Sequence, residues 1–321
     1  MVSESVSINK SINQLELFGY DSYFNLFSNL YNNKKLPNSI LLTGSKGLGK
    51  STFAYHFINY LFSKNEKNMY SILNYSINEN NSSYKLVKSG SHPNFFLIDN
   101  KLSEKDIKIE QIRNLLKFLS KSTYSKNLKV VLIDNAEYLN LSSSNSLLKA
   151  LEEPLPNTFF FIIHNNAFKL LNTIKSRCIE FKFFFKNSLK KEILNKILLS
   201  YEFNYDLTSL SENYIFDSPG NLIKYLTILK SKKIDINDQI SCINYFMEIY
   251  KSNKDFELLS FISTFIDKFY YDICISNKSM QSYCFLNHRK ILNHLHDIKK
   301  YNLNEKNVFI TIKNLLNNDQ R

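Results

Sequence analysis

Residues 40–51 read ILLTGSKGLGKS, a short apolar run that leads into a glycine-rich turn and then into a lysine and a serine. The turn matches the pattern GxxxxGK(S/T), in which glycines let backbone N–H groups point inward around phosphate oxygens. The apolar run predicts a strand before the turn, and a stripe of apolar residues over 50–62 predicts a helix after it. The N-terminus of that helix adds partial positive charge at the turn. This order of strand, turn and helix predicts a phosphate-binding loop.

The same loop predicts a site for ATP and Mg²⁺. We expect the Lys50 ammonium to reach the β- and γ-phosphates and the Ser51 hydroxyl to bind Mg²⁺. A second apolar run, VVLID at residues 130–134, predicts a buried strand whose last residue, Asp134, holds Mg²⁺ through water at the carboxyl end. A polar residue after a further strand, Asn165 or Asn166, is placed to sense phosphate. The predicted ATP-binding residues are Gly44, Gly47, Gly49, Lys50, Ser51, Thr52, Asp134 and Asn165, of which Ser51 and Asp134 serve Mg²⁺.

Short apolar runs alternate with helical periodicity in the first half of the chain, which predicts a parallel sheet covered by helices, an α/β fold. The polar segment Ser63–Lys88 is rich in Asn and Ser and is predicted to be a loop or a weakly ordered insertion. Strands are predicted at Ile40–Thr43, Phe95–Ile98, Val130–Ile133 and Phe159–Ile163, and helices at Lys50–Phe62, Ser144–Glu153, Leu189–Leu199 and Gly220–Leu229.

The second half of the chain changes character after Phe185. Strand signals fade, helical periodicity dominates, and the turn signal DSPG at residues 217–220 separates two helices. We therefore predict three parts: an α/β nucleotide-binding domain over 1–185, a small helical lid over 186–232 and an all-α domain over 233–321.

The overall composition sets broad limits on partners and location. The formal net charge of +12 favours polyanionic partners such as nucleic acid, but the abundance of Lys, Asn, Ile and Tyr is equally typical of an AT-rich genome. The four cysteines lie far apart, without the spacing of a zinc site or a disulfide framework. The first fourteen residues lack a basic-then-apolar signal pattern, and no apolar run is long enough for a membrane helix. We expect a cytoplasmic protein.

Several longer motifs indicate a family. Residues 145–178 read NSLLKALEEPLPNTFFFIIHNNAFKLLNTIKSRC, and SGSHPNF and IEQIRNLLKFLS stand upstream at 89–95 and 109–120. Together with LPNSILLTG at 36–44, they resemble the clamp-loader branch of the AAA+ ATPases over about the first 230 residues. Within the bacterial DNA polymerase III clamp loader, SGSHPNF and DSPGNL at 217–222 resemble the delta-prime branch more than the gamma/tau branch.

The resemblance implies an architecture, partners and one more functional residue. Members of the family are subunits of a hetero-pentamer with a RecA-like domain, a lid and a helical collar. The implied partners are gamma/tau and delta subunits, the sliding clamp and primer–template DNA. The arginine of the SRC motif, here Arg177, projects into the neighbouring subunit's ATP site, where a guanidinium can be worth ~10³–10⁵ in rate. Many members also carry a four-cysteine zinc module, but residues 63–88 contain no cysteine, so no zinc is expected.

The residue after Asp134 bears on whether the chain hydrolyses ATP. Hydrolysing relatives carry a glutamate there, whereas Asn135 cannot accept a proton, which costs typically ~10²–10⁴ in rate. Glu137 would point elsewhere if the strand continued, although a local bend could bring it back. Motor relatives also carry a lid arginine that touches the γ-phosphate. The matching stretch SPGN at 218–221 has none, and Lys224 is a doubtful substitute.

These features predict a subunit that holds ATP but cleaves it poorly, and that supplies Arg177 to a neighbour. One alternative is a gamma/tau-like motor with its own DNA-stimulated ATPase. Another is a stand-alone basic DNA-binding protein with a vestigial phosphate loop. The lysines and arginines are spread along the chain rather than gathered in a stripe, which argues against the second alternative.

Overall fold

A computed structural model describes residues 10–100, 106–121, 128–200, 217–277, 280–301 and 303–319. The described chain forms two compact units, the first ending at Ile223 and the second beginning at Lys224. The predicted boundaries of a three-part chain, at 185 and 232, stay a prediction. The expectation about a signal pattern falls mainly on residues 1–9, outside the described residues. No helix within the described ranges is long and apolar enough to cross a membrane.

The first unit is built on a parallel five-stranded sheet in the order β2-β3-β4-β1-β5, which confirms the predicted α/β fold class. The four predicted strands are present, each within two residues of its expected ends. The fifth strand was missed, because its sequence IEFK alternates charge with apolar residues over only four positions. The strands are β1 (Ser39–Gly44), β2 (Phe95–Ile98), β3 (Lys129–Ile133), β4 (Thr158–Asn165) and β5 (Ile179–Lys182).

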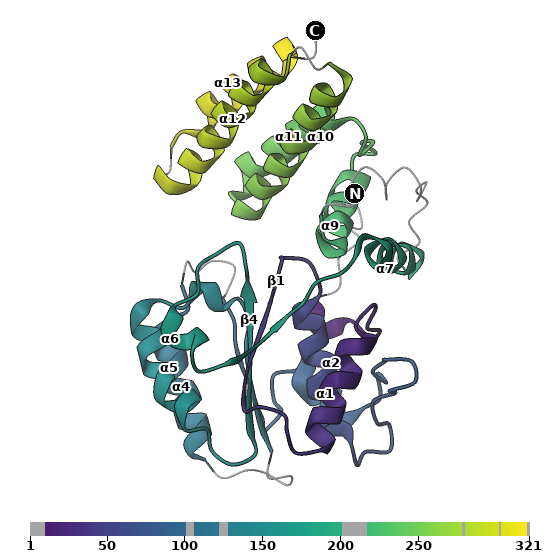
Figure 1. Cartoon of the computed structure of the whole chain (residues 1–321), viewed down its shortest axis with the longest axis vertical. Coiled ribbons are helices and arrows are strands. Elements are labelled where there is room, and N and C mark those ends of the chain that lie inside the picture. The colour runs from purple at the N-terminus through teal and green to yellow at the C-terminus, as the bar shows by residue number, and fades with distance from the viewer. Residues whose placement is uncertain are drawn as a thin grey trace. The chain divides into compact units, whose positions relative to one another are not determined.

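Helices cover both faces of this sheet (Figure 1). Alternate residues of the central strands point to opposite faces, so Leu42 and Phe161 lie in one apolar core and Leu41 and Phe160 in the other. The first core packs against α1 (Asp21–Asn32) and α2 (Lys50–Ser63), and the second against α4 (Ile109–Ser120), α5 (Leu141–Glu152) and α6 (Asn172–Lys175). Strands β1, β3 and β4 are buried at every position, which explains their nearly continuous apolar sequence.

The Asn-rich segment after α2 is more ordered than predicted. It contains helix α3 (Ser82–Lys88), and the fully buried Asn81 caps that helix by accepting a hydrogen bond from the Tyr84 N–H at 2.6 Å. The same Asn81 side chain accepts from Asn59 of α2 at 2.9 Å and donates to Glu66 at 2.7 Å. The prediction of a loop or weakly ordered insertion is therefore wrong for this part, since polar side chains hold it in place through specific hydrogen bonds.

The chain after β5 is helical, as predicted. Helix α7 (Asn187–Ser200) belongs to the first unit, and α9 (Pro219–Lys230) begins in the first unit and ends in the second. The second unit contains α10 (Gln239–Asn253), α11 (Phe256–Ser276), α12 (Gln281–Tyr301) and α13 (Glu305–Asp319). A buried carboxylate on α13, that of Asp319, accepts hydrogen bonds from Tyr270 of α11 and Asn287 of α12, and so joins three helices.

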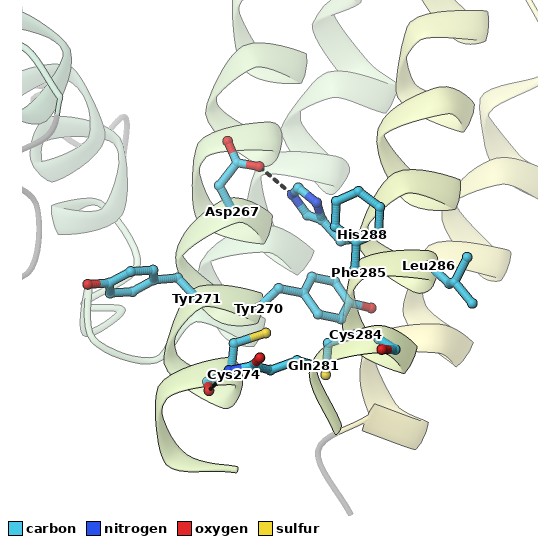
Figure 2. A pocket seen from close by; sticks show the side chains of 10 residues that line it. Asp267, Tyr270, Tyr271, Cys274, Gln281, Cys284, Phe285, Leu286 and His288 are labelled. Carbon is cyan, nitrogen blue, oxygen red and sulfur yellow. Dashed lines mark hydrogen bonds and ion pairs between the residues drawn. The ribbon is translucent and has the colours of Figure 1, made fainter. Parts of the chain in front are cut away.

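The second unit also has a hollow between α11 and α12, shown in Figure 2. Tyr270, Cys284 and Phe285 line it, and His288 pairs with Asp267 at 2.6 Å at its rim. None of the described residues lining the hollow is a lysine or an arginine. The hollow therefore lacks the lysines and arginines that a phosphate ligand requires.

Candidate nucleotide-binding site

The glycine-rich turn connects β1 to α2 at the carboxyl edge of the sheet. Gly47 and Gly49 have φ angles of 79° and 87°, in the left-handed region that glycine adopts without steric cost. The buried Tyr20, next to α1, donates a hydrogen bond from its hydroxyl to the Leu48 carbonyl at 3.0 Å. The turn is thus fixed by its own glycines and by an aromatic side chain that lies 28 residues earlier in the chain.

Lys50 begins α2 and lies against the turn. Its Nζ donates to the carbonyls of Gly44 at 2.8 Å and Ser45 at 2.7 Å. Burial lowers the pKa of the Lys50 ammonium to about 8, an effect that the negative charges of Glu137 and then Asp134 partly offset. The ammonium therefore stays mostly charged at neutral pH, as phosphate binding requires.

Ser51 and Asp134 meet as the sequence predicts. The Ser51 Oγ donates to the Asp134 Oδ2 at 2.7 Å, across 83 residues of chain. Burial raises the pKa of Asp134 to about 6, with the hydrogen bond from Ser51 acting in the opposite direction. A hydroxyl and a carboxylate side by side at the start of the helix form a pair of hard oxygen ligands of the kind that Mg²⁺ uses beside a nucleotide. Thr52 follows in the first turn of α2, half-buried.

The strand carrying Asp134 ends abruptly, and the next residue turns away from the site. Asn135 has a φ of 56° and a ψ of 51°, the left-handed conformation, and its side chain donates to Asp99 at 3.1 Å. Asp99 directly follows β2, on the side of β3 away from the glycine-rich turn. The amide of Asn135 is therefore directed away from the place where a phosphate would bind.

Glu137 points in a different direction from Asn135, because the left-handed Asn135 leads into a short 3₁₀ turn, Ala136–Tyr138. This bend brings the Glu137 carboxylate over the end of β4, where its Oε2 accepts a hydrogen bond from the Asn165 N–H at 3.1 Å. Glu137 would point elsewhere if β3 continued past Asp134, but β3 ends at Ile133. The local bend that the sequence left open is present.

The end of β4 supplies Asn165 beside the glycine-rich turn. Gly44 and Asn165 are register partners in the parallel β1–β4 pair, and the Asn166 N–H donates to the Gly44 carbonyl at 3.4 Å. The Asn165 side chain accepts from the Ala167 N–H at 3.2 Å. Asn165 is thus next to the turn, with its own side chain engaged in the loop that follows β4.

The start of α9 packs directly on the turn, a contact that sequence reasoning missed. The Gly220 N–H donates to the Gly47 carbonyl at 3.0 Å, and a Cβ on Gly220 would lie 2.5 Å from that same oxygen. Residues 218–221 match the segment in which motor relatives carry the lid arginine. These residues lie at the glycine-rich turn, and none of them is an arginine. Lys224, three residues further on, forms an ion pair with Glu257 of α11 at 2.5 Å.

Arg177 lies elsewhere on the first unit. It precedes β5 by two residues, and parallel strands place the start of β5 at the opposite edge of the sheet from the glycine-rich turn. Its Nε donates to Glu152 at 2.6 Å and its guanidinium also donates to the Thr173 carbonyl at 2.9 Å. The Arg177 side chain is 29% exposed, so it is neither buried in its own fold nor near the site of its own chain.

The motif residues Lys50, Ser51, Asp134 and Asn165 lie together, as expected from the sequence, but the contacts that shape the turn were not predicted. The contacts of Tyr20 and Gly220 with the turn were missed, because they join residues far apart in the chain. For Glu137 the sequence left open a local bend, and Asn135 is the signal for it, because asparagine adopts the left-handed conformation more readily than most residues with a Cβ.

The sheet order, the glycine-rich turn and the Ser51–Asp134 pair define a P-loop α/β protein of the AAA+ class, followed by an all-α region. Residues 19–186, just over half of the chain, match the family model described as DNA polymerase III, delta subunit. The chain belongs to this family, and its curated relatives include proteins named DNA polymerase III subunit delta′.

Individual relatives are similar over part of their length. The delta′ subunit of DNA polymerase III from Pseudomonas aeruginosa is 32% identical over 48% of this chain and 45% of its own. The gamma/tau subunit of Mycoplasma genitalium is 28% identical over 71% of this chain and 38% of its own. A solved gamma subunit-related protein from Thermotoga maritima aligns with a TM-score of 0.47 and 17% identity, over 92% of this chain and 99% of that one. The chain spans about half the length of the curated relatives it matches.

Proposed function

We propose that this chain is a delta-prime-like subunit of a DNA polymerase III clamp loader, which holds Mg–ATP in its own P-loop and supplies Arg177 to the ATP site of a neighbouring subunit. The proposed partners are gamma/tau and delta subunits in a hetero-pentamer that loads the sliding clamp onto primer–template DNA. The similarity to delta′ subunits supports this assignment.

The location of Arg177 is the observation that carries the proposal. The guanidinium lies at the amino edge of the sheet, whereas the glycine-rich turn, Asp134 and Asn165 lie at the carboxyl edge. An arginine at that edge cannot reach a nucleotide bound at its own P-loop. It is partly exposed and held in a fixed orientation by Glu152 and the Thr173 carbonyl, as a residue that acts on another subunit needs to be.

The residues of the P-loop fit a nucleotide with its Mg²⁺. A cradle of left-handed glycines at the N-terminus of a 14-residue helix suits phosphate oxygens, and Lys50 supplies a positive charge against it. Ser51 and Asp134 would hold Mg²⁺, which when bound neutralises phosphate charge. The chain's own residues thus bind and orient the triphosphate.

Hydrolysis at this site is proposed to be slow. Asn135 is turned toward Asp99, and the start of α9 brings a serine, a proline, a glycine and an asparagine to the P-loop in place of an arginine. Lys224 is engaged with Glu257. Asn135 cannot accept a proton from the attacking water, and the missing arginine weakens stabilisation of the transferred phosphoryl group.

Reconstitution of the clamp loader with purified gamma/tau and delta subunits tests the role of Arg177. We expect Arg177→Ala to lower the DNA- and clamp-stimulated ATPase of the assembly by at least tenfold while the complex still co-purifies intact. Glu180→Gln, a change close by in β5, serves as the control and should leave the stimulated rate within twofold. If Arg177→Ala instead prevents assembly, Arg177 has a structural role and the proposal is wrong.

The gamma/tau relative, similar over 71% of this chain, supports a second candidate, a motor subunit with its own ATPase. An ATPase assay on the isolated chain distinguishes the two. We expect negligible turnover. A motor-like rate that Lys50→Ala abolishes would establish the second candidate.

A further inference from the structure

Two carboxylates stand at the carboxyl edge of the sheet near the P-loop, and the proposed function uses only one of them. Asp134 is paired with Ser51. Glu137 is fixed separately, by the 3₁₀ turn after β3 and by the hydrogen bond from the Asn165 N–H at 3.1 Å. Since Asn165 pairs in register with Gly44, the first residue of the glycine-rich turn, the Glu137 carboxylate is held beside that turn.

Glu137 lies among groups whose charges its carboxylate affects. Of the carboxylates that oppose the lowering of the Lys50 pKa by burial, Glu137 acts more strongly than Asp134. Its negative charge also opposes the burial that lowers the pKa of His164, which belongs to β4 and whose Nε2 donates to the Phe168 carbonyl at 3.1 Å. The geometry agrees, because Glu137 accepts from the N–H of Asn165, the register partner of Gly44, and the Gly44 carbonyl accepts from the Lys50 ammonium at 2.8 Å.

We propose that Glu137 faces the terminal phosphate of the nucleotide bound at the P-loop and sets the preference of this site between ATP and ADP. The inference rests on the proposed binding of nucleotide at Lys50 and Ser51. The inference adds Glu137 to the nucleotide site, although Glu137 belongs neither to the P-loop pattern nor to the position directly after Asp134.

Electrostatics gives the direction of the effect. The γ-phosphate adds negative charge at the end of the nucleotide that Lys50 and β4 face. A carboxylate fixed at the end of β4 repels that added charge more than it repels the β-phosphate, because Coulomb energy falls with distance. Glu137 thus weakens binding of the triphosphate relative to the diphosphate and leaves the site ready to accept either.

The experiment compares affinities and needs no hydrolysis. Fluorescent ADP and a fluorescent ATP analogue with an imido bridge between the β- and γ-phosphates are titrated onto the full chain with Mg²⁺. For Glu137→Gln we expect the ratio of the triphosphate Kd to the diphosphate Kd to fall by about fivefold to tenfold, since the change removes one negative charge that the proposal places facing the γ-phosphate. Glutamine keeps a carbonyl oxygen that accepts from the Asn165 N–H, so the fold is preserved.

Two further variants separate charge from structure. Glu79→Gln makes the same change of charge at an exposed residue in the turn before α3 and should leave the ratio within twofold. Glu137→Asp keeps the charge and should stay close to the wild-type ratio. An unchanged ratio in Glu137→Gln, or an equal loss of affinity for both nucleotides, overturns the inference while leaving the proposed function standing. If the wild-type chain binds neither nucleotide, the ATP-holding part of the proposed function fails, and this inference fails with it.

Discussion

The sequence alone presents Asn135 as the loss of a catalytic glutamate, but its backbone conformation gives another reason for an asparagine here. Its φ of 56° and ψ of 51° belong to the left-handed region, which asparagine tolerates better than other residues with a Cβ. The turn made there directs Asn135 to Asp99 and Glu137 to Asn165. Asparagine at 135 thus removes a carboxylate from that position, but the bend that it permits brings the Glu137 carboxylate to Asn165.

Replacing Asn135 tests this explanation. We expect Asn135→Val to lower the free energy of unfolding by about 1–2 kcal/mol, because a β-branched residue is strained at this φ. Asn135→Gly should stay within about 0.5 kcal/mol of wild type, since glycine adopts the conformation freely. Urea denaturation followed by circular dichroism measures both. Equal losses in the two variants would mean that the side-chain hydrogen bond to Asp99, rather than the backbone, governs the position.

At the scale of elements, the P-loop and the start of α9 pack closely against each other. The Gly220 N–H donates to the Gly47 carbonyl, and the backbones approach so closely that neither glycine has room for a Cβ. Ser218 Oγ would lie 2.1 Å from a Cβ on Gly47. The first turn of α9 therefore packs tightly on the glycine-rich turn, and neither can move far without the other.

Gly220→Ala provides a test in which two effects have opposite signs. In an isolated helix, alanine would stabilise by up to about 1 kcal/mol relative to glycine. Here we expect destabilisation instead, by about 1–3 kcal/mol, because the new methyl group would meet the Gly47 carbonyl at 2.5 Å. Thermal unfolding gives the sign directly. A rise in melting temperature would show that α9 does not pack on the P-loop in solution.

At the scale of the whole molecule, the sequence predicted what is local and periodic. Lys50 and Ser51 follow from a contiguous motif, and β3 from five apolar residues in a row. The fold class follows from the alternation of such runs. Contacts between distant segments, such as Tyr20 with Leu48 and Arg177 with Glu152, could not be predicted from the sequence. No periodic pattern in the sequence indicates which distant residues will meet. The ordered Asn-rich segment was misjudged for the same reason, since its hydrogen bonds join residues across many positions.

That segment is joined to the core by a buried histidine. His56 lies on α2 and is fully buried, with its Nε2 bonded to the Gln14 carbonyl at 3.0 Å and its Nδ1 to the Tyr70 hydroxyl at 3.1 Å. The pairing assigns the proton to Nε2, which donates to the carbonyl, and leaves Nδ1 to accept from Tyr70. The neutral ring thus holds together α2, the chain before α1 and the segment after α2. Protonation would turn Nδ1 into a donor facing the Tyr70 hydroxyl.

His56 makes the stability of the first unit depend on pH in a predictable direction. Burial lowers the pKa of His56 in the folded chain from 6.5 to about 4, so between these values the unfolded chain binds a proton that the folded chain does not. Stability contributed by the neutral ring is fully present above pH 6.5 and is lost as pH falls, by about 2 kcal/mol at pH 5. We expect His56→Gln to be less stable than wild type at pH 7.5 and to lose about 2 kcal/mol less than wild type on acidification to pH 5. Urea denaturation at the two pH values measures this difference, and an equal loss in both proteins would show that other groups govern the acid sensitivity.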